Sequence, residues 1–184
     1  MARGRERRPA QLVVERVRAA TRGRTVVLVD GPSAAGKSTL AGEIAYELNA
    51  QLLPMTAFRP GPGGLEVASS VIAGSVLADE SPGYHRWDAE TGQLAEWHKV
   101  NPKRHLVIEG AGALSAANRE RASFGVWVHL PFEERRLRQF QRDGVHDPEL
   151  WEYCTLQERA FFQRERPDQL ADVIYDSGAD ILVD

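Results

Sequence analysis

Residues 25–39 read TVVLVDGPSAAGKST, and this stretch decides the fold. The uninterrupted apolar run 26–29 is typical of a strand that is buried on both faces of a parallel sheet. Gly31 and Gly36 follow, separated by four residues, and then come Lys37 and Ser38, which completes the P-loop pattern G-x4-G-K-[ST]. Leucine or isoleucine recurs every fourth residue over 40–48, so the loop should open an amphipathic helix. Strand, glycine-rich loop and helix are the context in which this pattern binds nucleotide phosphates.

The loop predicts a site for ATP or GTP with Mg2+. Its glycines let backbone amides turn toward the β-phosphate, and the following helix adds the positive end of its dipole. We expect Lys37 to contact the β- and γ-phosphates and the Ser38 hydroxyl to bind the metal ion. The predicted nucleotide-binding residues of the loop are Gly31, Ser33, Ala34, Ala35, Gly36, Lys37, Ser38 and Thr39.

Strand and helix signals alternate along the rest of the chain, which predicts an α/β fold of the P-loop NTPase and kinase type, a parallel sheet flanked by helices. Further strands are expected over 50–55, 105–109, 125–130 and 180–183, and helices over 65–78 and from Pro131 and Pro148. We expect one domain, residues 10–184, after a disordered basic tail, residues 1–9. An inserted hairpin at about 82–101 and an arginine-bearing helix at about 131–147 are its expected lids.

Composition sets broad limits on the function. The 184 residues carry a net charge of −3, which gives no general attraction to nucleic acid or membranes. No apolar run reaches the roughly 18 residues that a membrane helix needs. The single cysteine gives no sign of a disulfide-forming compartment. We therefore expect a cytoplasmic protein whose partners are a nucleoside triphosphate and a small-molecule acceptor; its oligomeric state stays open.

Glu109 closes the otherwise apolar strand 105–109, so we predict that it faces the phosphate site and holds Mg2+ or a water bound to it. A surface acid that caps a loop is the alternative. Arg135, Arg138 and Arg142 recur at spacings of three and four, which places them on one helix face. They could stabilise the charge on a transferred phosphoryl group or form a solvated basic face, and both interpretations stay open.

Several ordered motifs resemble the uridine kinase branch of the P-loop nucleoside kinases, in its compact actinobacterial form. They are VDGPSAAGKSTLA at 29–41, RWD at 86–88, EWH at 96–98, VIEGAGALS at 107–115, RLRQFQRDG at 136–144 and QER at 157–159. The resemblance implies a hairpin that helps to enclose the acceptor and an arginine lid over ATP. It makes Arg135 and Arg138 nucleotide-binding residues and Arg142 a catalytic one. It also places Arg86, Asp88 and His98 near the acceptor.

One segment departs from that family. After the second strand the family carries an acidic pair, whose first member is the general base; Thr56-Ala57 stand there in this chain. The interpretation is an ATP-dependent phosphotransferase that acts on a hydroxyl of a nucleoside or nucleoside-like molecule, with Lys37, Glu109 and Arg142 in catalysis. Two alternatives stay open: a kinase for another small metabolite or an antibiotic, and a nucleotide-binding protein with little or no transferase activity.

Overall fold

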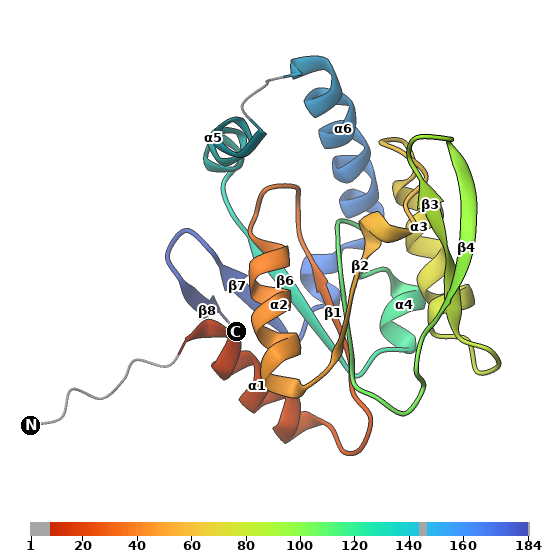
Figure 1. Cartoon of the computed structure of the whole chain (residues 1–184). Helices are drawn as coiled ribbons and strands as arrows, with labels where there is room; N and C mark the ends of the chain where they lie inside the picture. The colour runs from red at the N-terminus through yellow and green to blue at the C-terminus, as the bar shows by residue number, and fades with distance from the viewer. Residues whose placement is uncertain (1–7, 144–146, 184) are drawn as a thin grey trace, which may run out of the picture.

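The computed structural model describes residues 8–143 and 147–183, and six of its strands form one sheet (Figure 1). The strand order is β2–β5–β1–β6–β7–β8, and every neighbouring pair is parallel except β7–β8. The strands are β1 (Val26–Asp30), β2 (Gln51–Pro54), β5 (Leu106–Glu109), β6 (Phe124–His129), β7 (Val173–Asp176) and β8 (Ile181–Val183). The parallel order puts the carboxyl ends of β1, β2, β5 and β6 at one edge of the sheet.

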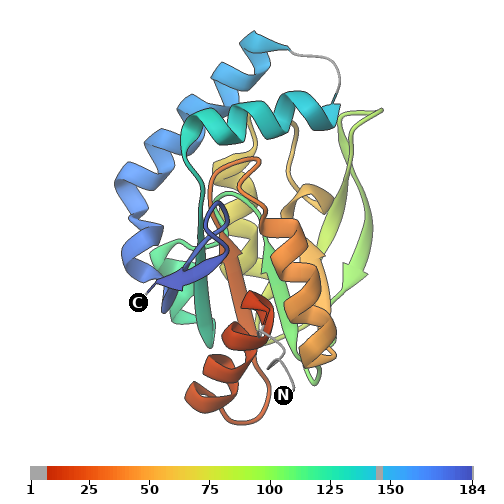
Figure 2. The ribbon, with the colours of Figure 1, turned by 90° about the vertical axis from the view of Figure 1, so that its left-hand side faces the viewer.

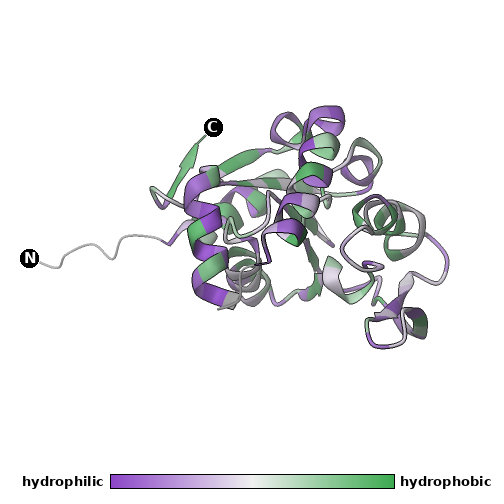
Figure 3. Ribbon diagram, turned by 90° about the horizontal axis from the view of Figure 1, so that it is seen from above, coloured by the Kyte–Doolittle hydropathy of each residue, from purple (hydrophilic) through white to green (hydrophobic). Residues whose placement is uncertain are grey.

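Helices cover both faces of this sheet. Helices α1 (Pro9–Ala20) and α2 (Lys37–Leu48) pack on the face to which Val27 and Val29 belong. The other face is covered by α3 (Leu65–Val71), its continuation as a π-helix (Ile72–Val76), and α4 (Ala116–Glu120). Because successive strand side chains point to opposite faces, β1 contributes to both cores, and all five of its residues are buried. Figure 3 shows the hydrophobic residues gathered on the strands between the helix layers.

Two long helices lie over the carboxyl edge of the sheet, as the second view shows (Figure 2). They are α5 (Phe132–Asp143) and α6 (Pro148–Glu165), and the short α7 (Pro167–Leu170) follows them. Asp147 caps α6, because its carboxylate accepts a hydrogen bond from the Leu150 amide. Strands β3 (Gly83–Asp88) and β4 (Gln93–Lys99) form a separate antiparallel hairpin beside the π-helix.

The predicted fold class is confirmed, and the structure adds four elements that the sequence interpretation lacked: α1, α4, α7 and β7. The sheet also ends in an antiparallel edge strand, β8. The expected helix over 65–78 is α3 followed by the π-helix. The lid helix expected at about 131–147 corresponds to α5, and residues 144–146 of the expected range lie outside the described residues. Residues 1–7 of the expected tail lie outside it too, and Pro9 begins α1. Within the described residues, no helix has the length and apolarity needed to cross a bilayer.

Candidate active site

The P-loop leaves β1 at the carboxyl edge of the sheet and turns directly into α2 (Figure 1). Each of its two glycines is needed for a different steric reason. A Cβ at Gly31 would lie 2.4 Å from the Val128 carbonyl oxygen on β6, so only glycine allows this close approach. Gly36 caps α2 with φ +101°, a conformation that other residues rarely adopt. Glycine at these two positions therefore allows the loop conformation that the motif predicts.

A cavity of about 720 Å³ opens in front of the loop. It is lined by P-loop residues, by the segment that follows β2, by the end of β5, and by α5 and α6. The lining residues are Ser33, Ala34, Gly36, Lys37, Ser38, Thr39, Met55, Thr56, Arg59, Glu109, Gly110, Ala111, Arg138, Gln139, Phe140, Arg142, Asp147, Leu150, Trp151 and Cys154. In a parallel α/β sheet, ligands bind at this carboxyl edge. The cavity thus brings the phosphate loop and the segment after β2 to one space.

Lys37 is 8% exposed, and its Nζ donates a hydrogen bond of 2.9 Å to the Pro32 carbonyl oxygen. Burial lowers the pKa of this lysine, and the carboxylates of Glu158, Asp30 and Glu109 act in the opposite direction. Nearby negative charge favours the ammonium form. These three carboxylates therefore hold a positive charge in a buried position beside the loop.

Ser38 and Glu109, the two predicted metal ligands, lie together. The Ser38 hydroxyl donates to Glu109 Oε1 at 3.0 Å, although the two residues belong to different elements. Glu109 is 7% exposed at the end of β5. Both groups offer the oxygen atoms that Mg2+ prefers, and Mg2+ commonly takes only one or two protein ligands, with phosphate oxygens and waters completing its octahedron. The donor set therefore fits Mg2+ bound together with a triphosphate.

The three arginines of α5 do not share one environment. Arg138 and Arg142 line the cavity; Arg138 donates to Ser177 and Arg142 to the Gln139 side chain. Arg135 is buried instead, and its guanidinium donates to the carbonyl oxygens of Leu130 and Ser33. Helical spacing predicted one common face for the three arginines. Arg135, the first of them, instead binds the P-loop backbone at Ser33 and stabilises the structure of the loop.

The hairpin residues lie outside this cavity. Arg86 pairs with Glu96 through two hydrogen bonds, of 2.8 and 3.2 Å. The Asp88 carboxylate accepts from backbone amides in the turn between β3 and β4, and His98 stacks on Tyr84 with ring centroids 5.3 Å apart. None of Arg86, Asp88 and His98 lines the cavity. Their contacts are those that a hairpin uses to hold its own shape.

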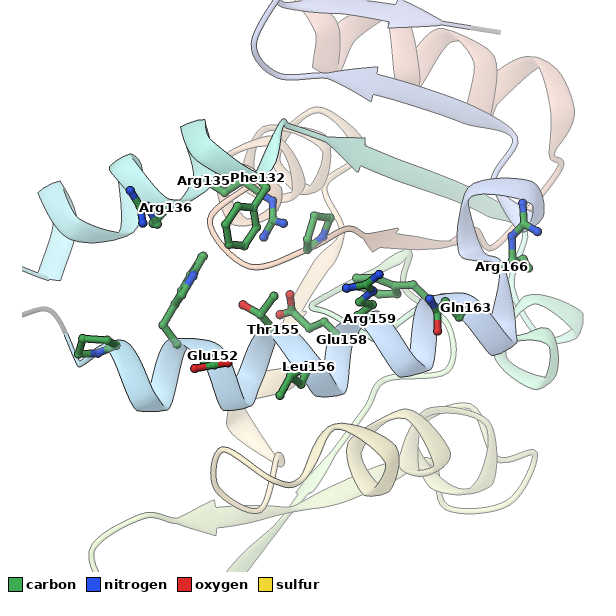
Figure 4. A pocket seen from close by; sticks show the side chains of 14 residues that line it. Phe132, Arg135, Arg136, Glu152, Thr155, Leu156, Glu158, Arg159, Gln163 and Arg166 are labelled. Atoms are coloured by element: carbon green, nitrogen blue, oxygen red, sulfur yellow. The ribbon is translucent and has the colours of Figure 1, made fainter.

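Sequence reasoning missed two buried carboxylates beside the loop. Glu158 on α6 is 2% exposed, and it accepts hydrogen bonds from the Ser33 amide at 3.1 and 3.2 Å and from the Ser33 hydroxyl. Figure 4 shows Glu158 on α6 and Arg135 on α5 lining a second cavity, of about 910 Å³, which Pro32 of the P-loop also lines. Glu158 stands in the QER motif, which was the available signal.

Asp30, the last residue of β1, is completely buried. Its carboxylate accepts hydrogen bonds from the amides of Gly31, Gly112 and Leu114, which ties the start of the P-loop to the segment after β5. Burial raises the pKa of Asp30 to about 6, while these three amides and the Lys37 charge act against the shift. An acid at the end of an apolar strand was the signal here, as it was for Glu109.

No protein-family model and no curated protein matches this sequence. Solved structures do resemble it. A possible uridine kinase from Bacillus stearothermophilus superposes with a TM-score of 0.62 at 20% identity, covering 91% of this chain and 97% of its own. A candidate fructose transport system kinase from Silicibacter sp. TM1040 gives 0.58 at 21% identity, covering 84% and 92%. At these identities the likeness concerns the fold, and the chain has the α/β fold of the P-loop kinases.

Proposed function

We propose that this protein transfers the γ-phosphoryl group of ATP to a hydroxyl of a small molecule, of the nucleoside-like kind that the sequence motifs suggest. The observation that carries the proposal is one cavity that holds both the P-loop and the segment after β2. Its volume of about 720 Å³ falls within the range of 300–1,000 Å³ typical of small-molecule sites. The fold shared with solved kinases, at 20–21% identity, supports it.

The nucleotide would lie with its phosphates against the P-loop amides and Lys37, while Arg138 and Arg142 face the same space from α5. Ser38 and Glu109 would hold Mg2+, which when bound neutralises charge on the β- and γ-phosphates. Phosphoryl transfer depends mostly on positioning and electrostatics, so this set of charges can support it with little further chemistry from the protein.

In the transfer step, the acceptor oxygen bonds to the γ-phosphorus as the bond from that phosphorus to the β–γ bridging oxygen breaks. The nucleoside diphosphate leaves, and the hydroxyl proton passes to water. Among the described lining residues the carboxylates already have other partners: Glu109 accepts from Ser38, and Asp147 caps α6. Thr56 faces the cavity where the resembled family has its general base. Arg86, Asp88 and His98 take no part in this proposal.

Lys37→Ala tests the proposal. It should weaken MgATP binding in calorimetry and abolish transfer, because the β- and γ-phosphates lose their buried cation. Lys103→Ala, an exposed lysine in the turn before β5, is the matched control and should behave as the unmodified protein. If Lys37→Ala retained both affinity and turnover, the assignment of the P-loop would fail.

One observation, the threonine at position 56, supports the alternative that the protein binds a nucleotide but has little or no transferase activity. Base catalysis contributes about 10²- to 10⁴-fold, so uridine and cytidine should be weak acceptors for the unmodified chain. If the missing carboxylate is the main defect, Thr56→Asp should raise uridine phosphorylation at least about tenfold. If the cavity is built for another acceptor, the substitution should change little. A hydroxylated metabolite should then be a better substrate than uridine.

A further inference from the structure

The segment after β2 carries a cation into the cavity. Arg59 lines it together with Met55 and Thr56, and its guanidinium donates to the Pro62 carbonyl oxygen. Its Nε is buried with no hydrogen-bond partner in the described part of the chain. Across the residues that the structure describes, no carboxylate forms an ion pair with Arg59. A buried donor on a charged group is costly to leave unsatisfied, which points to an acceptor that is not part of the chain.

A second residue that lines the same cavity also carries an unsatisfied donor. The Nε1 atom of Trp151 on α6 is buried, and it too has no partner among the described residues. An indole N–H can only donate, as can a guanidinium. Arg59 and Cys154 of α6 line the same cavity, and burial raises the pKa of the Cys154 thiol while the Arg59 charge acts against that shift. Two residues that line the cavity therefore carry donors that have no acceptor in the described part of the chain.

The backbone fixes the position of Arg59. Its amide donates to the Met55 carbonyl oxygen at 2.9 Å, and its own carbonyl accepts from the Gly61 amide at 2.9 Å. On α6, Gln157 donates to Pro62, so the loop is also attached to that helix. A cation that is already oriented loses little entropy when it binds a ligand.

Topology separates Arg59 from the nucleotide phosphates. The P-loop follows β1, and β5 lies between β1 and β2 in the sheet, so the segment after β2 approaches the cavity from beyond Glu109. Lys37 and the α5 arginines account for the triphosphate charge. Arg59 is the cation left for the acceptor. We infer that the acceptor carries an oxyanion, a carboxylate or a phosphate, which Arg59 and Trp151 bind. This inference rests on the proposed function: it keeps the kinase reaction and the cavity, and it names an anionic acceptor in place of the neutral nucleoside that the sequence motifs suggest.

The test uses protein saturated with Mg2+ and adenylyl imidodiphosphate, so that the triphosphate position is filled. Glycerate, glycerol 3-phosphate and neutral glycerol are titrated while NMR follows the indole N–H resonance of Trp151, assigned with Trp151→Phe. One or both anions should shift this resonance saturably, and glycerol should not. The anion that binds tells carboxylate from phosphate.

Arg59→Gln should weaken anion binding about 10- to 100-fold, the equivalent of one charged hydrogen bond. Arg59→Lys should give a smaller loss, since it keeps the charge without the planar fork. Arg136→Gln, an exposed arginine outside this cavity, is the matched control. Unchanged affinity for adenylyl imidodiphosphate shows that each variant is folded.

The outcomes separate the two proposals. If the unmodified protein does not bind adenylyl imidodiphosphate, the proposed function fails. If it does, but neither anion shifts Trp151, or Arg59→Gln binds the anion as tightly as the unmodified protein, the oxyanion inference is overturned and the proposed function stands.

Discussion

Replacing Glu158 by Gln should loosen the P-loop from outside the nucleotide cavity. The substitution keeps the size of the side chain but turns one carboxylate oxygen into an amide donor and removes the charge. Glu158 is 2% exposed and accepts three hydrogen bonds from the amide and hydroxyl of Ser33. Its carboxylate also makes the largest contribution among the charges that raise the pKa of Lys37 against the lowering effect of burial. The change therefore affects both the position of the loop and the charge beside it.

The magnitude follows from those contacts. A hydrogen bond to a charged group contributes about 1.5–3 kcal/mol, and breaking a buried charged pair costs about 3–5 kcal/mol. Since glutamine can keep one of its acceptors in place, we expect a loss of about 3 kcal/mol in the free energy of unfolding. With a urea slope of about 2 kcal/mol per molar, the midpoint should fall by roughly 1.5 M. MgATP affinity should fall about tenfold, because the Ser33 end of the loop loses its anchor.

Urea denaturation followed by circular dichroism measures the first quantity and calorimetry the second. Glu152→Gln is the matched control, since Glu152 lies on the same helix with an exposed side chain. A double-mutant cycle with Ser33→Ala should give a coupling energy of about 1–2 kcal/mol. If Glu158→Gln unfolds at the same urea concentration as the control and binds MgATP equally well, the reasoning about this anchor is refuted.

Three other predictions concern the site itself. Arg142→Ala should lower kcat about 10- to 100-fold and change the KM for ATP less, whereas Arg136→Ala should match the unmodified enzyme in steady-state kinetics; equal behaviour of both variants would favour a solvated basic face. Ser38→Ala should raise the Mg2+ concentration needed for half-maximal transfer about tenfold at fixed ATP, because one of two protein oxygens is lost, and an unchanged requirement would remove Ser38 from the metal site. Burial raises the pKa of Asp30 to about 6, so the folded state favours its protonated form. Proton binding to Asp30 therefore stabilises the folded state fully below the unfolded pKa of about 3.9, and this stabilisation is lost as pH rises through about 6. Relative to Asp30→Asn, the free energy of unfolding of the unmodified protein should fall by up to about 3 kcal/mol between pH 4 and 7.5, as measured by urea titrations. A difference between the two proteins that stays constant with pH would contradict the assignment.

Strong local patterns gave the fold correctly, and weak ones were missed. The P-loop and its flanking strand and helix are specified by residues close in sequence, and the hairpin is set by its turn. In strand β7 only Val173 is buried and the strand ends at Asp176, so it lacks the long apolar run of β1, and it is stabilised by pairing with β6. The stripe Ala10, Val13, Val14 and Val17 could have revealed α1, because these positions share one helix face.

The candidate site could be predicted only where its groups belong to a local motif. Arg135 and Arg142 are equivalent by spacing, yet one is buried under the P-loop and the other lines the cavity. Glu158 meets Ser33 across 125 positions of the sequence, and no periodicity reports such a contact. Distant partners of this kind are set by the packing of α5 and α6 over the sheet.

The strand order has a consequence for the kinetics of folding. β1, which carries the P-loop, pairs with β5 and β6, and its nearest partners, Val26 with Leu106 and Val27 with Phe124, lie 80 and 97 positions apart in the chain. Such distant pairings make loop closure expensive in entropy and slow folding, and the phosphate loop gains its rigid base only once they have formed. A ligand that needs this loop binds after the rate-limiting barrier. It therefore protects the protein by slowing unfolding and leaves the folding rate nearly unchanged.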